Sequence, residues 1–278
     1  MEHKKVWYIT GASKGMGLSL TKQLLAQEQI VVATSRNAAA LIAAIGSTER
    51  FLPQQVNLTS EQSIADSLQY AFDTFGRIDV IVNNAGYGIG GALEELSTEE
   101  IAANFDVNFF AVVRVIQQAM PFLRRQGFGH IINISSIAGF APGIGWSVYA
   151  AAKFAVSGLS EALANDLKPL GIQVTAVSPG WFRTSFAKPE SIVFGKKQIK
   201  DYQYIRAFHE KFNQMDGLQA GDPDKIATAL MQLVAHPNPP VNLFLGTDAY
   251  NRAASKTIQL SAQLKEWKTV SASTDFPV

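Results

Sequence analysis

The chain has 278 residues, of which 47% are hydrophobic and 17% are charged, and it contains no cysteine. This composition supports a large core, argues against disorder, and excludes disulfides, thiol nucleophiles and thiolate metal sites. The net charge is only +1, so we expect neither nucleic acid nor an anionic membrane surface as a partner. No apolar run reaches the roughly 18 residues of a membrane span, which makes the cytoplasm the expected location.

Short runs of branched and aromatic residues alternate along the chain with segments of helical period. Several runs, such as 80–82, are apolar on consecutive positions, as expected for strands that helices cover on both faces. This alternation predicts a single Rossmann-like domain, a doubly wound α/β fold with a parallel seven-stranded sheet. The expected strands are 6–10, 30–35, 51–56, 78–83, 130–135, 172–177 and 241–245.

Two segments depart from this alternation within the expected domain 1–278. Residues 186–216 are predicted to form a substrate lid, in which Tyr204, Phe208 and Phe212 form the buried stripe of a helix. Residues 249–278 are predicted to form a C-terminal helical extension. Its apolar stripe of Leu260, Leu264 and Trp267 could cover the core or meet another subunit.

A glycine-rich loop, Thr10-Gly-Ala-Ser-Lys-Gly-Met-Gly17, follows the first expected strand and opens the first helix. In that position, bare backbone and the unpaired amides of a helix N-terminus can receive a pyrophosphate, although a plain structural turn is the alternative. A kinase-type phosphate loop is disfavoured, because Lys14 is followed by glycine instead of a hydroxyl residue. The expected cofactor contacts in the loop are Gly11, Ser13, Lys14, Gly15, Met16 and Gly17.

The end of the second expected strand bears on the choice of cofactor. Dinucleotide sites that prefer NAD(H) usually carry an acid there, but this chain has Ser35 and Arg36. A guanidinium is matched to a ribose 2′-phosphate, and Lys14 could add a second positive charge. The sequence therefore predicts that NADP(H) is preferred over NAD(H), the alternative being that both cations are simply solvated.

Tyr149 and Lys153 are four residues apart, so on a helix they project from the same face. Ser136 stands thirteen residues before Tyr149, at the end of the fifth expected strand, where ligands bind in such sheets. A phenol with a pKa near 10 needs about 4 kcal/mol to titrate near neutrality, which an ammonium roughly 4 Å away supplies at an effective dielectric of about 20. Tyr149 is thus the candidate acid/base for reducing a carbonyl or oxidising an alcohol, the alternative being that the pair is a coincidental surface contact.

Together these motifs resemble the short-chain dehydrogenase/reductase family over about residues 4–185. The resemblance rests on Thr-Gly-x-x-x-Gly-x-Gly at 10–17, Asn-Asn-Ala-Gly at 83–86, Asn108, Ser136, Tyr-x-x-x-Lys at 149–153, and Pro179-Gly180 with Thr184. It implies a catalytic tetrad of Asn108, Ser136, Tyr149 and Lys153, in which Asn108 holds a water that connects the lysine to solvent. It also implies that 83–86 braces the sheet beside the cofactor. The further expected cofactor contacts are Ser35, Arg36, Asn57, Leu58, Asn84, Ala85, Gly86, Tyr149, Lys153, Pro179, Gly180 and Thr184.

The sequence departs from the family at Asn57, where members usually carry an acid that contacts adenine. An amide oxygen can accept the same hydrogen bond, more weakly. Family members commonly form dimers or tetramers through the helices of segment 97–127 and of Tyr149, so the resemblance implies a homodimer or homotetramer.

The expected substrate is a hydrophobic carbonyl compound or alcohol of small size. Phe140, Trp146, Trp181, Phe182 and Phe186 could line its pocket or simply pack the core. No catalytic metal is expected, because His3, His130, His209 and His236 show no ligand-like spacing with acids. Two other functions stay open at this point, a non-catalytic dinucleotide-sensing regulator and a sugar-nucleotide epimerase or dehydratase.

Overall fold

A seven-stranded sheet with the strand order β3-β2-β1-β4-β6-β7-β9 forms the centre of the computed structural model, which describes residues 4–188 and 191–276. All its neighbouring strands are parallel. The predicted doubly wound sheet is confirmed, with strand ends that agree to within two residues. The strands are β1 (Val6–Ile9), β2 (Ile30–Ser35), β3 (Phe51–Gln55), β4 (Val80–Asn83), β6 (Gly129–Ile134), β7 (Ile172–Pro179) and β9 (Asn242–Leu245).

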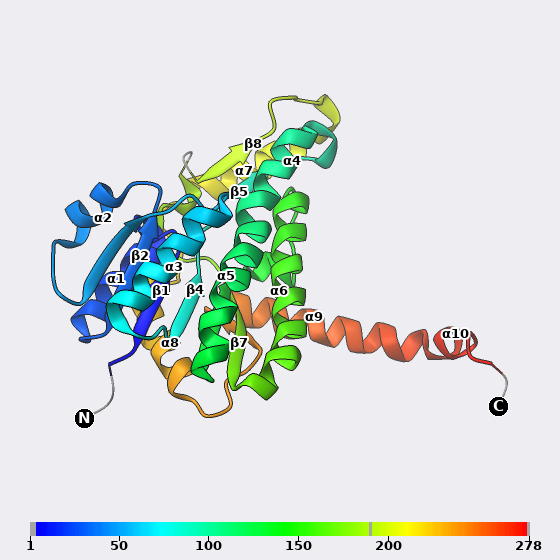
Figure 1. The fold of residues 1–278 in the computed structure, drawn as a ribbon. Coiled ribbons are helices and arrows are strands. Elements are labelled where there is room, and N and C mark those ends of the chain that lie inside the picture. Colours follow the sequence, from blue (N-terminus) through cyan, green and yellow to red (C-terminus); the bar gives the residue numbers. More distant parts are fainter. Residues whose placement is uncertain (1–3, 189–190, 277–278) are drawn as a thin grey trace.

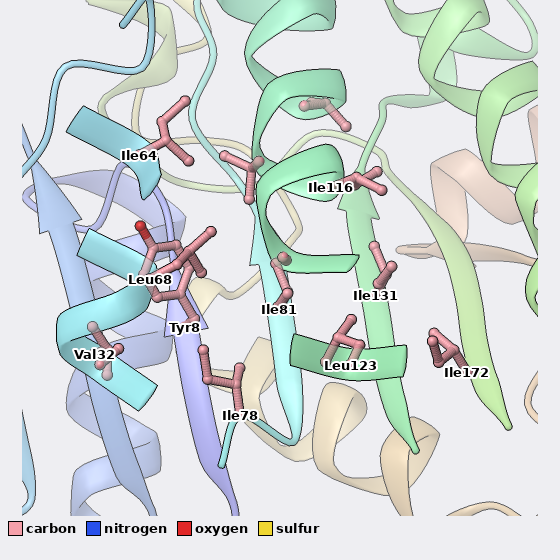
Figure 2. Packing of buried hydrophobic residues seen from close by; sticks show 14 of the residues in the cluster. Tyr8, Val32, Ile64, Leu68, Ile78, Ile81, Ile116, Leu123, Ile131 and Ile172 are labelled. Atoms are coloured by element: carbon pink, nitrogen blue, oxygen red, sulfur yellow. The ribbon is translucent and has the colours of Figure 1, made fainter. Parts of the chain in front are cut away.

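Helices cover both faces of the sheet (Figure 1), because successive residues of each strand point to opposite sides. On one face Tyr8 and Ile81 belong to the cluster drawn in Figure 2, and on the other Trp7 and Val80 belong to a second cluster. The helices over the first face are α3 (Glu61–Phe75), α5 (Ala111–Gln126) and α6 (Ser147–Leu167). Those over the second face are α1 (Gly15–Ala26), α2 (Ala38–Ile45) and α8 (Ile226–Ala235).

Side-chain caps explain where several helices begin. Asn37 accepts a hydrogen bond from the first turn of α2, and Ser60 does the same for α3. Ser97 and Glu100 form a reciprocal capping box at the start of α4 (Thr98–Phe105). Helix α1 differs, because the side chain of Lys14 at its N-cap does not cap it. Its first amides therefore keep their hydrogen-bonding capacity for a ligand.

The segment expected to form a lid folds into a small substructure at one end of the molecule (Figure 1). Strand β8 (Ile192–Phe194) pairs with β5 (Gly88–Gly90), and helix α7 (Gln203–Gln214) follows. Residues 189–190 of this segment lie outside the described residues. This two-stranded sheet was not predicted, because each of its strands has only three residues and two of those in β5 are glycines.

The predicted buried stripe of α7 is wrong at its first member. Tyr204 is 57% exposed, whereas Ile205 and His209 are buried and Phe208 and Phe212 pack against the cluster around Trp146. The inward face is therefore centred about one residue later than the spacing of the aromatic residues indicated.

The C-terminal extension begins on the body and then leaves it. Ala249 and Ala253 of α9 (Thr247–Glu266) are buried beside Ile137, after which α9 and α10 (Lys268–Ala272) project away from the sheet (Figure 1). The stripe of Leu260, Leu264 and Trp267 is 41%, 73% and 57% exposed, so it does not cover the core. Residues 277–278 lie outside the described part. Among the helices that the structure describes, none has the length and apolar character needed to cross a bilayer.

Candidate active site

A cavity of about 1040 Å³ opens at the carboxyl ends of the parallel strands. It runs from the glycine loop past the ends of β2, β4, β6 and β7 to the segment of α7. Most of the residues predicted to touch the cofactor line it. They are Gly11, Ser13, Lys14, Gly15, Met16, Ser35, Arg36, Asn57, Leu58, Asn84, Ala85, Gly86, Tyr149, Lys153, Pro179, Gly180 and Thr184.

The glycine loop is held close to the end of β4, and its glycines make that approach possible. Gly11 has a φ of +66°, and a Cβ on it would lie 2.7 Å from the Cα of Ala85. Gly17 does not line the cavity. A Cβ there would lie 2.5 Å from Nδ2 of Asn84, so a glycine is needed at position 17 for close packing. That same amide nitrogen donates to the carbonyls of Thr10 and Gly11 at 2.9 and 3.1 Å. The bare loop and the uncapped start of α1 fit the pyrophosphate of a dinucleotide.

Both predicted cations line the cavity, but their charged groups lie beside different elements. Arg36 is exposed at the end of β2, while Nζ of Lys14 donates to Oγ of Ser191 at 2.8 Å and so contacts the segment of β8. The amide oxygen of Asn57, which was expected to face adenine, already accepts hydrogen bonds from the backbone and hydroxyl of Thr59 at 3.1 and 2.9 Å. The side chain of Asn57 therefore stabilises the turn in which it lies.

Helix α6 places Tyr149 and Lys153 on the same face, where they are 7% and 4% exposed. Nζ of Lys153 lies 5.9 Å from the centroid of the Tyr149 ring and donates to the carbonyl of Ile134 at 2.8 Å. Ser136 follows β6 and lines the cavity with Tyr149, and its hydroxyl lowers the pKa of the phenol. These three predicted catalytic residues therefore meet at the cavity wall.

Asn108 stands just behind that wall, in a π-helical turn (Asp106–Phe110) between α4 and α5. Its Nδ2 donates to the carbonyls of Tyr87 and Asn104 at 2.9 and 3.1 Å, and its Oδ1 accepts from the amide of Tyr87 at 3.2 Å. A Cβ on Gly86 would lie 2.5 Å from that oxygen and 3.4 Å from Nζ of Lys153. Because Gly86 has no side chain, the side chains of Asn108 and Lys153 can both lie close to it.

The predicted brace between strands is a buried chain of amides and a hydroxyl. Asn83 of β4 donates to Oδ1 of Asn133 on β6 at 2.8 Å, and Asn133 donates to Oγ of Ser160 on α6 at 2.9 Å. All three side chains are buried. These hydrogen bonds fix α6, and with it Tyr149 and Lys153, against the centre of the sheet.

The family model described as short chain dehydrogenase matches residues 5–192. The chain belongs to this family. Oxidoreductase BOA17 of Botryotinia fuckeliana (strain B05.10) is 33% identical over 96% of this chain and 98% of its own length. The 3-ketodihydrosphingosine reductase of Bacteroides thetaiotaomicron is 38% identical over 86% of both chains.

Solved structures agree with this assignment of the dehydrogenase. A short-chain dehydrogenase from Streptomyces avermitilis has a TM-score of 0.89 at 34% identity and covers 99% of this chain and 100% of its own. A short chain dehydrogenase/reductase from Burkholderia phymatum, solved in complex with NAD, has a TM-score of 0.82 over 94% of this chain and 95% of its own. At 22% identity, the second likeness shows the fold alone. The predicted family and fold class are confirmed.

Burial dominates the electrostatics of the catalytic pair in the dehydrogenase. It raises the pKa of Tyr149 to about 12, against a smaller lowering by the hydrogen bond with Ser136, and it lowers the pKa of Lys153 to about 8. From the sequence, the charge of Lys153 is expected to bring the pKa of the phenol near neutrality. In this structure the desolvation of the phenol is the larger effect, so Tyr149 holds its proton at neutral pH.

The other half of the cavity is mainly aromatic. Trp146, Trp181, Phe182, Phe186, Phe208 and Phe212 line it. The ring of Trp146 stands edge-on to Tyr149 with the centroids 5.8 Å apart. Phe140 packs against Phe244 instead, with the centroids 5.1 Å apart, so for this residue the alternative of packing in the core holds. The remaining aromatic residues form an apolar wall that ends at the phenol.

Two residues at the aromatic end of the cavity were not predicted from the sequence. Nε2 of His209 hydrogen-bonds the carbonyl of Gly145 at 3.0 Å, and its ring packs against Trp146, so it fixes α7 to the loop before α6. Arg252 of α9 reaches the cavity from far along the chain. Neither residue lies in a motif, so only the fold could reveal its place. Within the described residues no group of three His, Asp or Glu side chains is arranged to hold a metal ion, and His3 lies outside them.

Proposed function

We propose that this short-chain dehydrogenase reduces the carbonyl of a hydrophobic small molecule with NADPH, or oxidises the matching secondary alcohol with NADP⁺. The observation that carries the proposal is the position of Tyr149 and Lys153, both buried where the dinucleotide half of the cavity meets its aromatic half. The 3-ketodihydrosphingosine reductase to which the chain is similar is, by its name, a carbonyl reductase, which supports this reaction class. When bound, the nicotinamide supplies or accepts the hydride.

Tyr149 donates a proton to the carbonyl oxygen in the reducing direction, and Ser136 donates a hydrogen bond to the same oxygen. A pKa of about 12 keeps the phenol protonated, which is the state that reduction needs. The protonated Lys153 stabilises the phenolate that is left after the transfer. Asn108 lies next to Lys153 across Gly86, where it can hold a water that returns the proton from solvent.

Glycine-loop residues Gly11 to Met16, together with Asn84 to Gly86 and Pro179 to Thr184, would hold the dinucleotide along the cavity. We propose that Arg36, with Lys14, selects NADP(H) over NAD(H) by pairing with the 2′-phosphate. Arg36 takes part in none of the ion pairs of the described chain, so its guanidinium is available to an anion.

The reaction is tested by following NADPH oxidation over a panel of aryl and aliphatic ketones. Tyr149→Phe keeps the ring packing against Trp146 but removes the acid, so kcat should fall by about 100- to 10,000-fold. NADPH binding, measured by calorimetry, should stay within a few-fold of the wild type. A Tyr149→Phe enzyme with near-normal kcat would end the assignment.

The cofactor preference is tested separately by binding. Arg36→Ala should weaken NADPH binding by about 10- to 100-fold, the worth of charged hydrogen bonds to phosphate, and should leave NADH binding nearly unchanged. Lys22→Ala is the matched control, since Lys22 is an exposed cation of α1 that does not line the cavity. Equal loss for both nucleotides, or no loss, would contradict the preference.

We also propose that the protein forms a homodimer or homotetramer through the helices of segment 97–127 and α6. Phe110 and Phe154 support this arrangement, because they are 47% and 39% exposed on these elements. Sedimentation analysis of a Phe110→Asp, Phe154→Asp double variant should show a shift to monomer. The cytoplasmic location stays a prediction from the sequence.

A further inference from the structure

Arg252 places a cation at the aromatic half of the cavity, away from the glycine loop. Four cationic side chains line the cavity within the described chain, and three of them already have a role in the proposed reaction: Lys14, Arg36 and Lys153. Arg252 comes from α9, the extension that the catalytic motifs do not include. It is partly buried, and that burial lowers the pKa of its guanidinium, while the charge of Asp248 raises it by a smaller amount.

The hydrogen-bonding capacity of Arg252 exceeds what its surroundings use. One terminal nitrogen donates to the carbonyl of Ala141, and a guanidinium has five N–H donors in all. Gly143 lies near the same nitrogen but has no side chain that could cover the guanidinium. Even a Cβ at this position would lie 4.0 Å from the nitrogen. The guanidinium is therefore fixed on one side and open toward the cavity on another.

No carboxylate of the described chain neutralises Arg252 by direct contact. The ion pairs of the described residues join other groups. Asp248, one turn earlier on α9, attracts the guanidinium without forming an ion pair with it, since its Oδ2 accepts the amide of Trp181 at 2.8 Å. Asp106, the acid in the cavity lining, pairs with Arg114 at 2.7 Å. A partly desolvated cation with open donors favours an anionic ligand.

We propose that Arg252 binds a carboxylate of the substrate, so that the preferred substrates are keto acids or hydroxy acids with an apolar body and an anionic end. The inference deepens the proposed function and rests on it. The apolar body lies along the aromatic wall of Trp146, Trp181 and Phe186, with the reacting carbonyl at Tyr149 and the carboxylate at the mouth near Gly143. A planar guanidinium accepts a carboxylate through two parallel hydrogen bonds, which adds orientation to attraction.

A purely structural role for Arg252 makes a different prediction, and the chain offers a matched control. Lys256, one turn later on α9, donates to the carbonyl of Phe140 and so ties α9 to the same loop, but it does not line the cavity. If both cations only fix the loop, Arg252→Gln and Lys256→Gln should change the turnover of acids and esters alike. If Arg252 binds the carboxylate, Arg252→Gln alone should change their ratio.

The experiment compares kcat/KM for 4-acetylbenzoate and 3-(4-acetylphenyl)propanoate with the values for their methyl esters. In at least one of the two acid–ester pairs, the wild type should have a kcat/KM for the acid about 10-fold or more above that for the ester. This is the contribution expected of a charge-assisted hydrogen-bonded pair. The acid-to-ester ratio should collapse by about the same factor in Arg252→Gln, recover in part in Arg252→Lys, and persist in Lys256→Gln. A wild type without acid preference, or a preference that survives Arg252→Gln, would overturn the proposal.

A binding measurement separates this proposal from the reaction itself. Calorimetry on the NADP⁺-loaded protein with 4-phenylbutyrate and with its methyl ester reads the anion site without turnover, because neither compound carries an oxidisable alcohol. Tighter binding of the acid that is lost in Arg252→Gln, in a protein that reduces no ketone, would keep the anion site and reject the proposed reductase activity. Ketone reduction together with equal binding of acid and ester would do the reverse.

Discussion

Lys153→Met should make the protein inactive and more stable. The ammonium is needed for catalysis, but its burial destabilises the folded protein. The pKa of Lys153 falls from 10.5 to about 8 on burial, and each pKa unit corresponds to about 1.36 kcal/mol, so the charged form destabilises the folded protein by about 3 kcal/mol. Methionine has a similar length and no charge. It leaves the carbonyl of Ile134 without its donor, which costs about 1 to 2 kcal/mol.

The net effect is a gain of about 1 to 2 kcal/mol in the free energy of unfolding at pH 7, seen as a rise of roughly 2 to 6 °C in Tm. The gain depends on pH in a defined direction. The depressed pKa of Lys153 means that the unfolded chain binds more protons between about pH 8 and 10.5, so wild-type stability due to this group rises through that window. The advantage of Lys153→Met should therefore be full below pH 8 and shrink toward pH 10.5.

Urea unfolding of the wild type and the variant at pH 7 and pH 10 measures this difference, with NADPH-dependent ketone reduction as the activity assay. Lys153→Arg is the control that keeps the charge, and it should not gain stability. A Lys153→Met protein that is less stable than the wild type at pH 7, or that keeps its turnover, would refute the reasoning about this buried charge.

Three further predictions follow from the geometry. Gly86→Ala should lower kcat by at least about 10-fold because its Cβ would meet Oδ1 of Asn108 at 2.5 Å, whereas Gly158→Ala, with open space around it, should leave kcat unchanged and add about 0.5 to 1 kcal/mol of stability; equal kcat in both variants would contradict this. Because burial raises the pKa of Tyr149 to about 12, ketone reduction should be level across about pH 6 to 8 while alcohol oxidation rises by up to about tenfold per pH unit, and a falling oxidation profile would count against the phenol. Ser97→Ala should cost about 1 kcal/mol in urea unfolding by removing the cap of α4, and a neutral result would show that the capping box contributes nothing.

The sheet was predictable because its signal is local and repeated. Most of the seven strands contain an apolar run between helical segments, and parallel pairing buries both faces, so the pattern of residues such as 80–82 indicates the fold directly. The tiny sheet of β5 and β8 gives no such signal. Its strands are held by pairing between distant parts of the chain, which no single stretch of sequence reveals.

The site was predictable where short motifs meet strand ends, and unpredictable where side chains arrive from afar. Ser136, Tyr149 and Lys153 meet as their spacing indicated, because a strand end and one helix face fix all three. The π-helical turn at Asn108 and the arrival of Arg252 depend on tertiary packing, which has no pattern of its own in the sequence. The place of Phe140 stayed open for the same reason, since an aromatic residue in a loop can face the cavity or the core with equal ease.

The most direct test of the proposed chemistry follows the hydride itself. The protein is incubated with NADPH that carries deuterium at the transferring position of the nicotinamide, together with a ketone it consumes, and the alcohol is examined by NMR. We expect deuterium at the carbinol carbon in one configuration, and a strongly reduced yield of that product with Tyr149→Phe. An alcohol formed without deuterium at that carbon, or the same yield from Tyr149→Phe, would contradict hydride transfer assisted by this phenol.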